Sequence, residues 1–531
     1  MADDITHYDS IEGYCNELSY AAGAVAEVCV HTHAASFSVS VERWGSAREP
    51  VWAADELAGA AQATPADADA SGCGWSVSVE IPVDTAWRTG FYLITLTANH
   101  DDDHDDDHDD NQHRNVGYAG FVVTAAPDHA APTLFVLGTN TWNAYNSWGG
   151  RSLYSGGTQV AFRRPWGRGM LVRPEVERDD RKSRPRYTGE EPDADGEIYQ
   201  AYRFANGYPG FMGSAGWFTH ERRFVEWAEG SGYRFDYAVS SDLARLRASG
   251  DLTRYRAIVS VGHDEYWSAD QREAVEAFVA DGGNVASLSG NTMFWQVRPE
   301  PAAHGGTTMV CHKYSAHRTD PLAATNPTAM TGMWADPEVA RPESNFLGAA
   351  SLYGLYHRFG QATARGVGGF VVHRDDHWMF ADTGLRYGDV LGADFGVVGY
   401  ETVGCLLGFD HARLPIAVAD PALHGSSHPH DTCVVAYTQS SNLGVGEYPK
   451  SISALDDQGD LEFIAERIFG GGPAALAKVR HGNSVMLTCR PSGPSGGEVV
   501  VVGSTDWVFG LADPAVAQVT RNIMEHVCSE L

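Results

Sequence analysis

The sequence has few features of a membrane-spanning, disulfide-stapled or zinc-binding protein. No stretch approaches the about 18 uninterrupted apolar residues that a membrane-spanning helix needs. Eight cysteines are scattered from Cys15 to Cys528 without a CxxC pair, which favours buried free thiols over a disulfide framework or a zinc site. The first residues have neither the basic start nor the apolar run of a signal peptide. We therefore expect a cytoplasmic protein.

Positive charge is also scarce. The chain has 38 lysines and arginines against 69 aspartates and glutamates, for a formal net charge of −31. Such a surface repels phosphate groups, which argues against nucleic acid or an anionic membrane as a partner. A hydrated acidic surface suits solubility in concentrated salt, so the sequence predicts a halophilic protein.

The 531 residues suit two or three domains, the first of which is predicted to be β-rich. Phe37, Val39 and Val41 alternate with polar residues, and 75–81 repeats the pattern. This alternation is typical of half-buried strands, so we predict an immunoglobulin-like β-sandwich over residues 1–126. The aspartate-rich run at 101–110 is predicted to be a solvated loop, because it lacks the glycine turn and terminal glutamate of an EF-hand loop.

From residue 127 the pattern becomes α/β. Short apolar runs at 134–137, 257–261 and 285–288 are separated by segments with helical spacing, which predicts a parallel sheet buried on both faces. Residues 268–283 form one clear helix, with a capping box at its start and a glycine pair at its end. The segment at about 300–440 is rich in glycine, proline and histidine, and we interpret it as a β-rich insertion or lid.

The strongest candidate for chemistry is the loop after the strand at 257–261. Ligands of open α/β sheets bind beyond the carboxyl ends of strands, and this loop carries His263, Asp264, Glu265 and Tyr266. These groups can transfer protons or bind metals. The two acids could equally cap the helix that starts near Ser268, and composition leaves both interpretations open.

Three further clusters have the composition of a pocket wall. The first, at 140–154, includes Asn143, Tyr145 and Arg151, although an Asn/Gly-rich turn network would look the same. The second, just past another strand, contains Asn291 and Trp295, and the third places Glu401 beside an aromatic residue. The turn after 257–261 lacks the cysteine of an amidotransferase, which argues against thiol catalysis.

Several motifs in order along the chain resemble one known family. They are Asn-Thr-Trp-Asn-Ala-Tyr-Asn at 140–146, Val-Gly-His-Asp-Glu-Tyr-Trp-Ser at 261–268, Gly-Asn-Thr-Met-Phe-Trp-Gln-Val-Arg at 290–298, Val-Gly-Tyr-Glu at 398–401 and Val-Gly-Ser-Thr-Asp-Trp at 502–507. Together they resemble the C-terminal domain of the family of the large (beta) subunit of N,N-dimethylformamidase. The resemblance implies that 127–531 is a glutamine-amidotransferase-like, flavodoxin-like α/β domain behind the sandwich.

The resemblance also implies an activity, the hydrolysis of the C–N bond of small N-substituted amides. The family enzyme holds iron by two tyrosinates and a glutamate, so we expect Fe(III), with Tyr266 as one ligand and Glu343 as the nearest candidate for the glutamate. Arg222 and Arg223 stand where the second tyrosine is expected.

The site residues expected on this basis fall into two groups: the catalytic residues His263, Glu265 and Glu401, and the substrate-pocket residues Asn143, Tyr145, Arg151, Asn291 and Trp295. The expected partners are a small amide and a further copy of the chain or a small partner subunit. The alternative is a non-catalytic or carbohydrate-recognising protein that retains the fold and the pocket.

Overall fold

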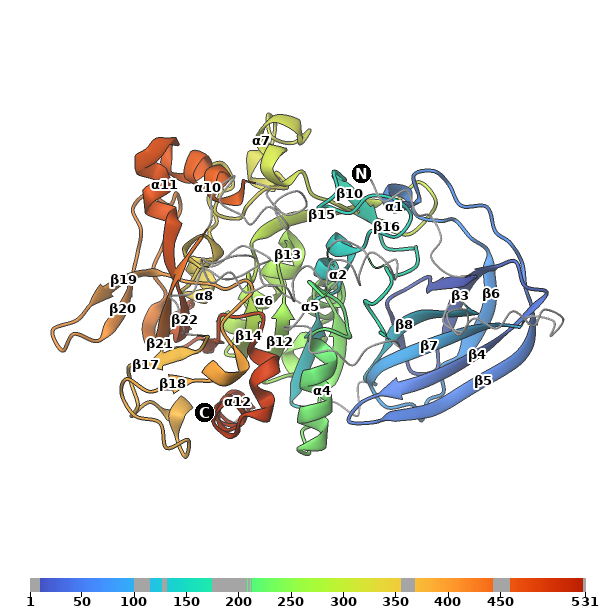
Figure 1. The fold of residues 1–531 in the computed structure, drawn as a ribbon, viewed down its shortest axis with the longest axis horizontal. Coiled ribbons are helices and arrows are strands. Elements are labelled where there is room, and N and C mark those ends of the chain that lie inside the picture. The colour runs from blue at the N-terminus through green and yellow to red at the C-terminus, as the bar shows by residue number, and fades with distance from the viewer. Residues whose placement is uncertain are drawn as a thin grey trace, which may run out of the picture.

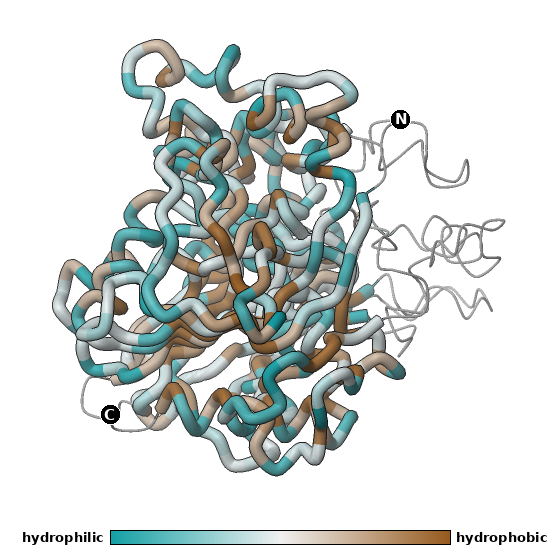
Figure 2. Tube along the Cα trace, turned by 90° about the vertical axis from the view of Figure 1, so that its left-hand side faces the viewer, coloured by the Kyte–Doolittle hydropathy of each residue, from teal (hydrophilic) through white to brown (hydrophobic). Residues whose placement is uncertain are grey.

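The computed structural model describes residues 10–99, 115–126, 131–173, 208, 211, 213–354, 368–442 and 459–528. These residues form a β-rich N-terminal region followed by a mixed α/β region (Figure 1). The aspartate-rich run at 101–110 lies outside the described residues. Figure 2 shows hydrophobic stretches of the chain gathered toward the middle of the molecule and hydrophilic stretches more often at its edges.

The N-terminal region is built from two sheets that share one core. The three-stranded sheet has the order β1-β3-β6 and the five-stranded sheet the order β2-β8-β7-β4-β5. Their strands are β1 (Ile11–Cys15), β2 (Ser19–Ala21), β3 (Val25–Thr32), β4 (Ser36–Trp44), β5 (Arg48–Ala58), β6 (Val77–Pro82), β7 (Gly90–Asn99) and β8 (Val116–Thr124). Alternate residues of both sheets, such as Val28, Val39 and Ile94, are buried between them. This arrangement is a sandwich, with β2 and β8 paired parallel and the other strand pairs antiparallel.

The outer face of the five-stranded sheet packs against the α/β region. Phe91 stacks on Trp217 with ring centroids 4.2 Å apart, and both rings belong to the core of the α/β region. Beside them the guanidinium of Arg43 donates to the carboxylate of Glu229 at 2.6 and 3.0 Å, with both side chains largely buried. The two regions therefore share an apolar interface fixed by a buried ion pair.

The α/β region is organised around a nine-stranded mixed sheet of order β11-β9-β12-β14-β23-β22-β21-β17-β18. The first five strands pair in parallel and the last four antiparallel. These strands are β9 (Thr133–Leu137), β11 (Asp236–Val239), β12 (Ala257–His263), β14 (Asn284–Gly290), β17 (Phe370–Val372), β18 (Val390–Leu391), β21 (His430–Ser441), β22 (His481–Arg490) and β23 (Val499–Val501). β9, β12, β14 and β23 are buried throughout, as expected for parallel strands covered on both faces.

Helices and two smaller sheets complete the region. The helices are α1 (Ala68–Ser71), α2 (Thr139–Tyr145), α4 (Glu221–Gly230), α5 (Asp242–Ser249), α6 (Ala269–Ala280), α7 (Ala316–Thr319), α8 (Ser344–Leu347), α10 (Asp460–Phe469), α11 (Gly472–Arg480) and α12 (Pro514–Cys528). The strands are β10 (Gln159–Ala161), β13 (Tyr266–Ser268), β15 (Trp295–Pro301) and β16 (Thr307–Val310), in the order β10-β16-β15-β13, and the hairpin of β19 (Leu406–Phe409) and β20 (Pro415–Val418). The described residues contain no helix long and apolar enough to cross a membrane.

The strand–helix–strand unit predicted over 257–288 is present as β12, α6 and β14. Ser268 is the N-cap of α6, and its Oγ accepts the backbone N–H of Gln271 at 3.2 Å. The segment predicted to be a β-rich insertion or lid, at about 300–440, contains β16 to β20 and most of β21. Its strands β17, β18 and β21 extend the main sheet at the antiparallel end, because their buried faces join the same core. The glutamine-amidotransferase-like assignment stays a prediction.

Candidate functional site

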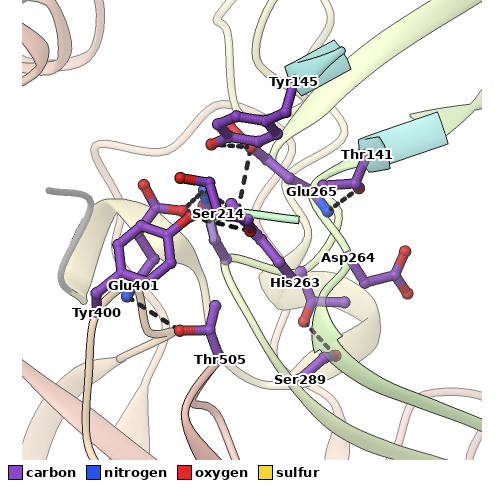
Figure 3. Close-up of polar contacts among 12 residues, drawn as sticks. Thr141, Tyr145, Ser214, His263, Asp264, Glu265, Ser289, Tyr400, Glu401 and Thr505 are labelled. Carbon is purple, nitrogen blue, oxygen red and sulfur yellow. Dashed lines mark hydrogen bonds and ion pairs between the residues drawn. The ribbon is translucent and has the colours of Figure 1, made fainter. Parts of the chain in front are cut away.

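His263 is the centre of a buried polar cluster at the carboxyl end of β12. Its Nε2 lies 2.6 Å from Oε2 of Glu401 and 3.2 Å from Oε2 of Glu265 (Figure 3). On the other side of the ring, Nδ1 lies 2.9 Å from both the backbone oxygen of Ser214 and the hydroxyl of Tyr400. The ring therefore has acceptors at both nitrogens, as an imidazolium requires.

The sheet geometry explains how residues far apart in sequence meet here. β12 and β14 run parallel with His263 opposite Gly290, so Asn291 follows directly at the same edge. At Gly290 a Cβ atom would lie 2.2 Å from the backbone oxygen of Glu401, so only glycine allows this close approach. The backbone oxygen of Glu401 also accepts the N–H of Thr505, which follows β23. Three strand ends thus fix the position of the Glu401 carboxylate.

Glu265 is held by the largest set of donors in the site. The hydroxyl of Tyr145 donates to its carboxylate at 3.1 Å, the hydroxyl of Tyr154 at 2.8 and 2.9 Å, and the indole Nε1 of Trp295 at 2.7 Å. Its backbone N–H donates to the side chain of Thr141 at the start of α2. Donors of this number fix the carboxylate in one orientation.

The charges of the three central groups stabilise one another. Burial alone would lower the pKa of His263, but the negative charge and hydrogen bonds of Glu401 and Glu265 raise it to about 10. Burial alone would raise the pKa of Glu265, but hydrogen bonding to His263, its charge and that of Lys313 lower it. These shifts favour an imidazolium at His263 and a carboxylate at Glu265 at neutral pH.

Asn291 contributes one unused hydrogen-bonding atom. Its Nδ2 donates to Oε2 of Glu401 at 3.0 Å, while its Oδ1 is buried and accepts no hydrogen bond from the described residues. Its backbone is in the left-handed region at φ 49°, which turns the side chain from the end of β14 into the cluster. A buried amide oxygen without a donor is costly and is frequent where a ligand or water binds.

The cluster has the donors of a metal site. One nitrogen of His263 and one oxygen each of Glu265 and Glu401 lie within 4.8 Å of one another, and all three side chains are buried. The phenols of Tyr145 and Tyr154 both donate to the carboxylate of Glu265. Carboxylate, phenol and imidazole are ligands that a hard ion such as Fe(III) accepts, so the donor set fits the expected iron.

Six of the residues expected from the sequence come together here: His263, Glu265, Glu401, Tyr145, Asn291 and Trp295. Tyr266 lies at the edge of the cluster, where its hydroxyl donates to the hydroxyl of Tyr154 at 2.8 Å.

Three expected residues lie elsewhere. The amide of Asn143 bonds to the backbone of Val160 and to Arg164, so it braces a turn. Arg151 is exposed, and its backbone N–H donates to Asp69 of α1. Glu343 begins α8 and accepts the backbone N–H of Ser351.

At residues 222–223, where the resemblance places a second tyrosine, the chain has two arginines, and Arg222 makes a packing contact. Arg222 lies on α4, pairs with Glu226 and stacks over the ring of Phe218.

Tyr154 and Lys313 are residues of this region that the sequence analysis did not predict. Tyr154 ends the 140–154 cluster, so its place in that motif was the available signal, whereas no motif pointed to Lys313.

The sequence comparisons place this site in a known family. A family model described as "N,N-dimethylformamidase beta subunit-like, C-terminal" matches residues 38–522. The chain belongs to this family. The N,N-dimethylformamidase beta subunits of Alcaligenes sp and Paracoccus aminophilus are 32% and 31% identical over 77 residues. That stretch covers 14% of this chain and 10% of each relative, so the family assignment extends well beyond it.

One solved structure, a family 123 glycoside hydrolase from Clostridium perfringens, aligns with 52% of this chain and 59% of its own. Its sequence identity is 8% and its TM-score 0.10, so it carries no argument about the fold or the function of this protein.

Proposed function

We propose that this protein hydrolyses the C–N bond of small N-substituted amides at the His263 cluster. The observation that supports the proposal is the placement of His263 between two buried carboxylates, 2.6 Å from Glu401 and 3.2 Å from Glu265. A proton donor beside a proton acceptor is what amide hydrolysis requires, because water must lose a proton while the leaving amine gains one.

In the proposed reaction, Glu401 accepts a proton from the attacking water as its oxygen bonds to the acyl carbon. Asn291 orients that water through its unused Oδ1. As the C–N bond breaks, the imidazolium of His263 gives its Nε2 proton to the amine nitrogen, and Glu401 then returns a proton to His263. The carboxylic acid product ionises and its proton is taken up by the free amine, so atoms and charge balance.

Iron belongs to the same proposal. Glu265 would hold the ion, with the phenols of Tyr145 and Tyr154 as further oxygen donors, which leaves His263 and Glu401 for proton transfer. A bound Fe(III) would polarise the amide carbonyl and lower the pKa of water. Burial and the charge of Glu265 raise the pKa of both phenols well above 10, so they are neutral donors in the protein described here. The relatives are named as beta subunits, and a partner subunit is a further part of the proposal.

The test combines metal analysis with amine release from small formamides and acetamides. We expect the full-length protein to contain iron and to release amine, and Glu401→Gln to lower kcat by about 10²–10⁴, the usual range for a general acid–base group. Glu273→Gln, which changes an exposed carboxylate on α6, is the matched control and should keep full activity. Wild-type protein that releases no amine from either class of amide would contradict the proposal and leave a binding protein as the alternative.

A further inference from the structure

Lys313 is an unusual residue in this chain. Only four of the 38 basic residues are lysines, at 182, 313, 450 and 478. Lys313 is 4% exposed, whereas lysine is almost never fully buried unless it is paired. It follows β16 and has a left-handed backbone with φ 48°, a conformation that costs energy for any residue other than glycine. The fold thus accepts both a backbone cost and a desolvation cost at one position.

The ammonium of Lys313 lies in a cage of aromatic rings. Its Nζ is 3.4 Å from the ring centroid of Tyr154, 5.1 Å from that of Trp295 and 5.3 Å from that of Tyr314. Aromatic faces stabilise a cation without using its N–H groups. Among the described residues, no atom accepts a hydrogen bond from Nζ. The N–H groups of Nζ that do not face a ring can therefore donate to a ligand.

The cage lies directly against the proposed active site. Tyr154 and Trp295, which form two of its walls, both donate to the carboxylate of Glu265. Burial lowers the pKa of Lys313, and the negative charge of Glu265 opposes that shift. On the far side, Tyr314 donates to Asp460 at 2.5 Å, and burial raises the pKa of Asp460 to about 7. Lys313 is thus a second cationic group near Glu265, in addition to His263.

We propose that Lys313 binds a small monocarboxylate, with its free N–H groups donating to the carboxylate oxygens. The choice of a monocarboxylate as the physiological ligand rests on the proposed function, because the acid released by amide hydrolysis is such an anion. A compact ammonium suits a small anion, whereas the planar fork of arginine, the usual basic residue of this chain, would need more room. Charge-assisted hydrogen bonds to the ligand would satisfy donors that the protein leaves unpaired.

The test is titration of the full-length protein with sodium formate and sodium acetate by calorimetry, at constant ionic strength set with KCl. We expect saturable binding, weakened about 10- to 100-fold in Lys313→Met, the loss expected for one hydrogen bond to a charged group. Lys478→Met is the matched control, because Lys478 also lies over an aromatic ring, 5.1 Å from Phe469, but on α11 outside the site. It should bind both anions like the wild type.

A second measurement does not depend on the folding of a variant. With four lysines in the chain, labelling with ¹³Cε-lysine gives a simple spectrum in which the Lys313 signal should shift on addition of formate. No saturable binding to the wild type, no shift of that signal, or equal binding by folded Lys313→Met would each overturn the proposal. Anion binding without amine release would leave Lys313 as a carboxylate-binding residue and remove the amidase. Amine release without anion binding would support the amidase and overturn the role of Lys313 as a carboxylate-binding residue.

Discussion

Asp264 and Glu265 are neighbours in one loop, and both side chains are buried, but their pKa values are shifted in opposite directions. Burial raises the pKa of both, but at Glu265 the hydrogen bond and charge of His263 reverse the shift and lower it. Asp264 has weaker compensation, and its pKa is raised to about 6. Figure 3 shows the Asp264 side chain directed away from Glu401 and Tyr145.

A second buried acid, Glu221, lies near Asp264. A Cβ at Gly138 would lie 3.6 Å from Oδ1 of Asp264 and 3.9 Å from Oε1 of Glu221, so the two carboxylates approach the same glycine. Burial raises the pKa of Glu221 to about 8, although Trp142 donates to it at 2.7 Å. Of these three buried carboxyl groups, only Glu265, which faces His263 and the charge of Lys313, has a lowered pKa.

The largest effect on activity should appear when Glu265 and Asp264 are each replaced by the corresponding amide in separate variants. Glu265→Gln removes the anion that three donors and His263 hold in place, so amine release should fall by roughly 10³ and bound iron should be lost. Asp264→Asn keeps the shape of a group outside the cluster and should change kcat/KM by less than about tenfold. The measurements are steady-state kinetics and metal content, and equal losses in the two variants would contradict the division of roles.

The next effect concerns the stability that His263 contributes. Its pKa is about 10 in the folded protein and about 6.5 in an unfolded chain, so between these values only the folded state binds the proton. This contribution, of the order of a few kcal/mol, is complete below about pH 6.5 and is lost as the pH rises toward 10. Urea unfolding from pH 6 to pH 10 should show a steeper decline for the wild type than for His263→Gln. Parallel curves would show that His263 is not held as an imidazolium.

The smallest effect is expected for the stability of a variant at Glu221. The pKa of Glu221 is raised, so ionising it in the folded protein costs stability, and this cost grows from about pH 4.5 to about pH 8. Glu221→Gln should therefore melt higher than the wild type at pH 8 and nearly equal to it at pH 4.5, and it should keep its activity. Glu229→Gln is the opposite control, because Arg43 lowers the pKa of Glu229 and its loss should destabilise the protein. A lower melting temperature for Glu221→Gln at pH 8 would contradict the comparison.

Local sequence patterns predicted the elements that carry their own signals. The capping box at Ser268 and the apolar runs at 257–261 and 285–288 identified β12, α6 and β14, because caps and buried strands depend on neighbouring residues. The period-2 pattern identified the sandwich in the same way. The antiparallel extension of the sheet by β17, β18 and β21 carried no such signal, since the pairing of β17 with β21, across more than 60 residues, is set by packing. The salt requirement expected from the net charge stays a prediction.

The sequence by itself determined the family, the strand–helix–strand unit at 257–288 and the loop that carries His263 and Glu265. Only the tertiary structure decided which other residues join them. It brought Glu401 and Asn291 against His263 and placed Lys313 over the ring of Tyr154, whereas Asn143, Arg151 and Glu343 lie elsewhere. The physical reason is that a motif records chemical type and chain position, whereas a buried charge depends on which groups the packed strands place around it.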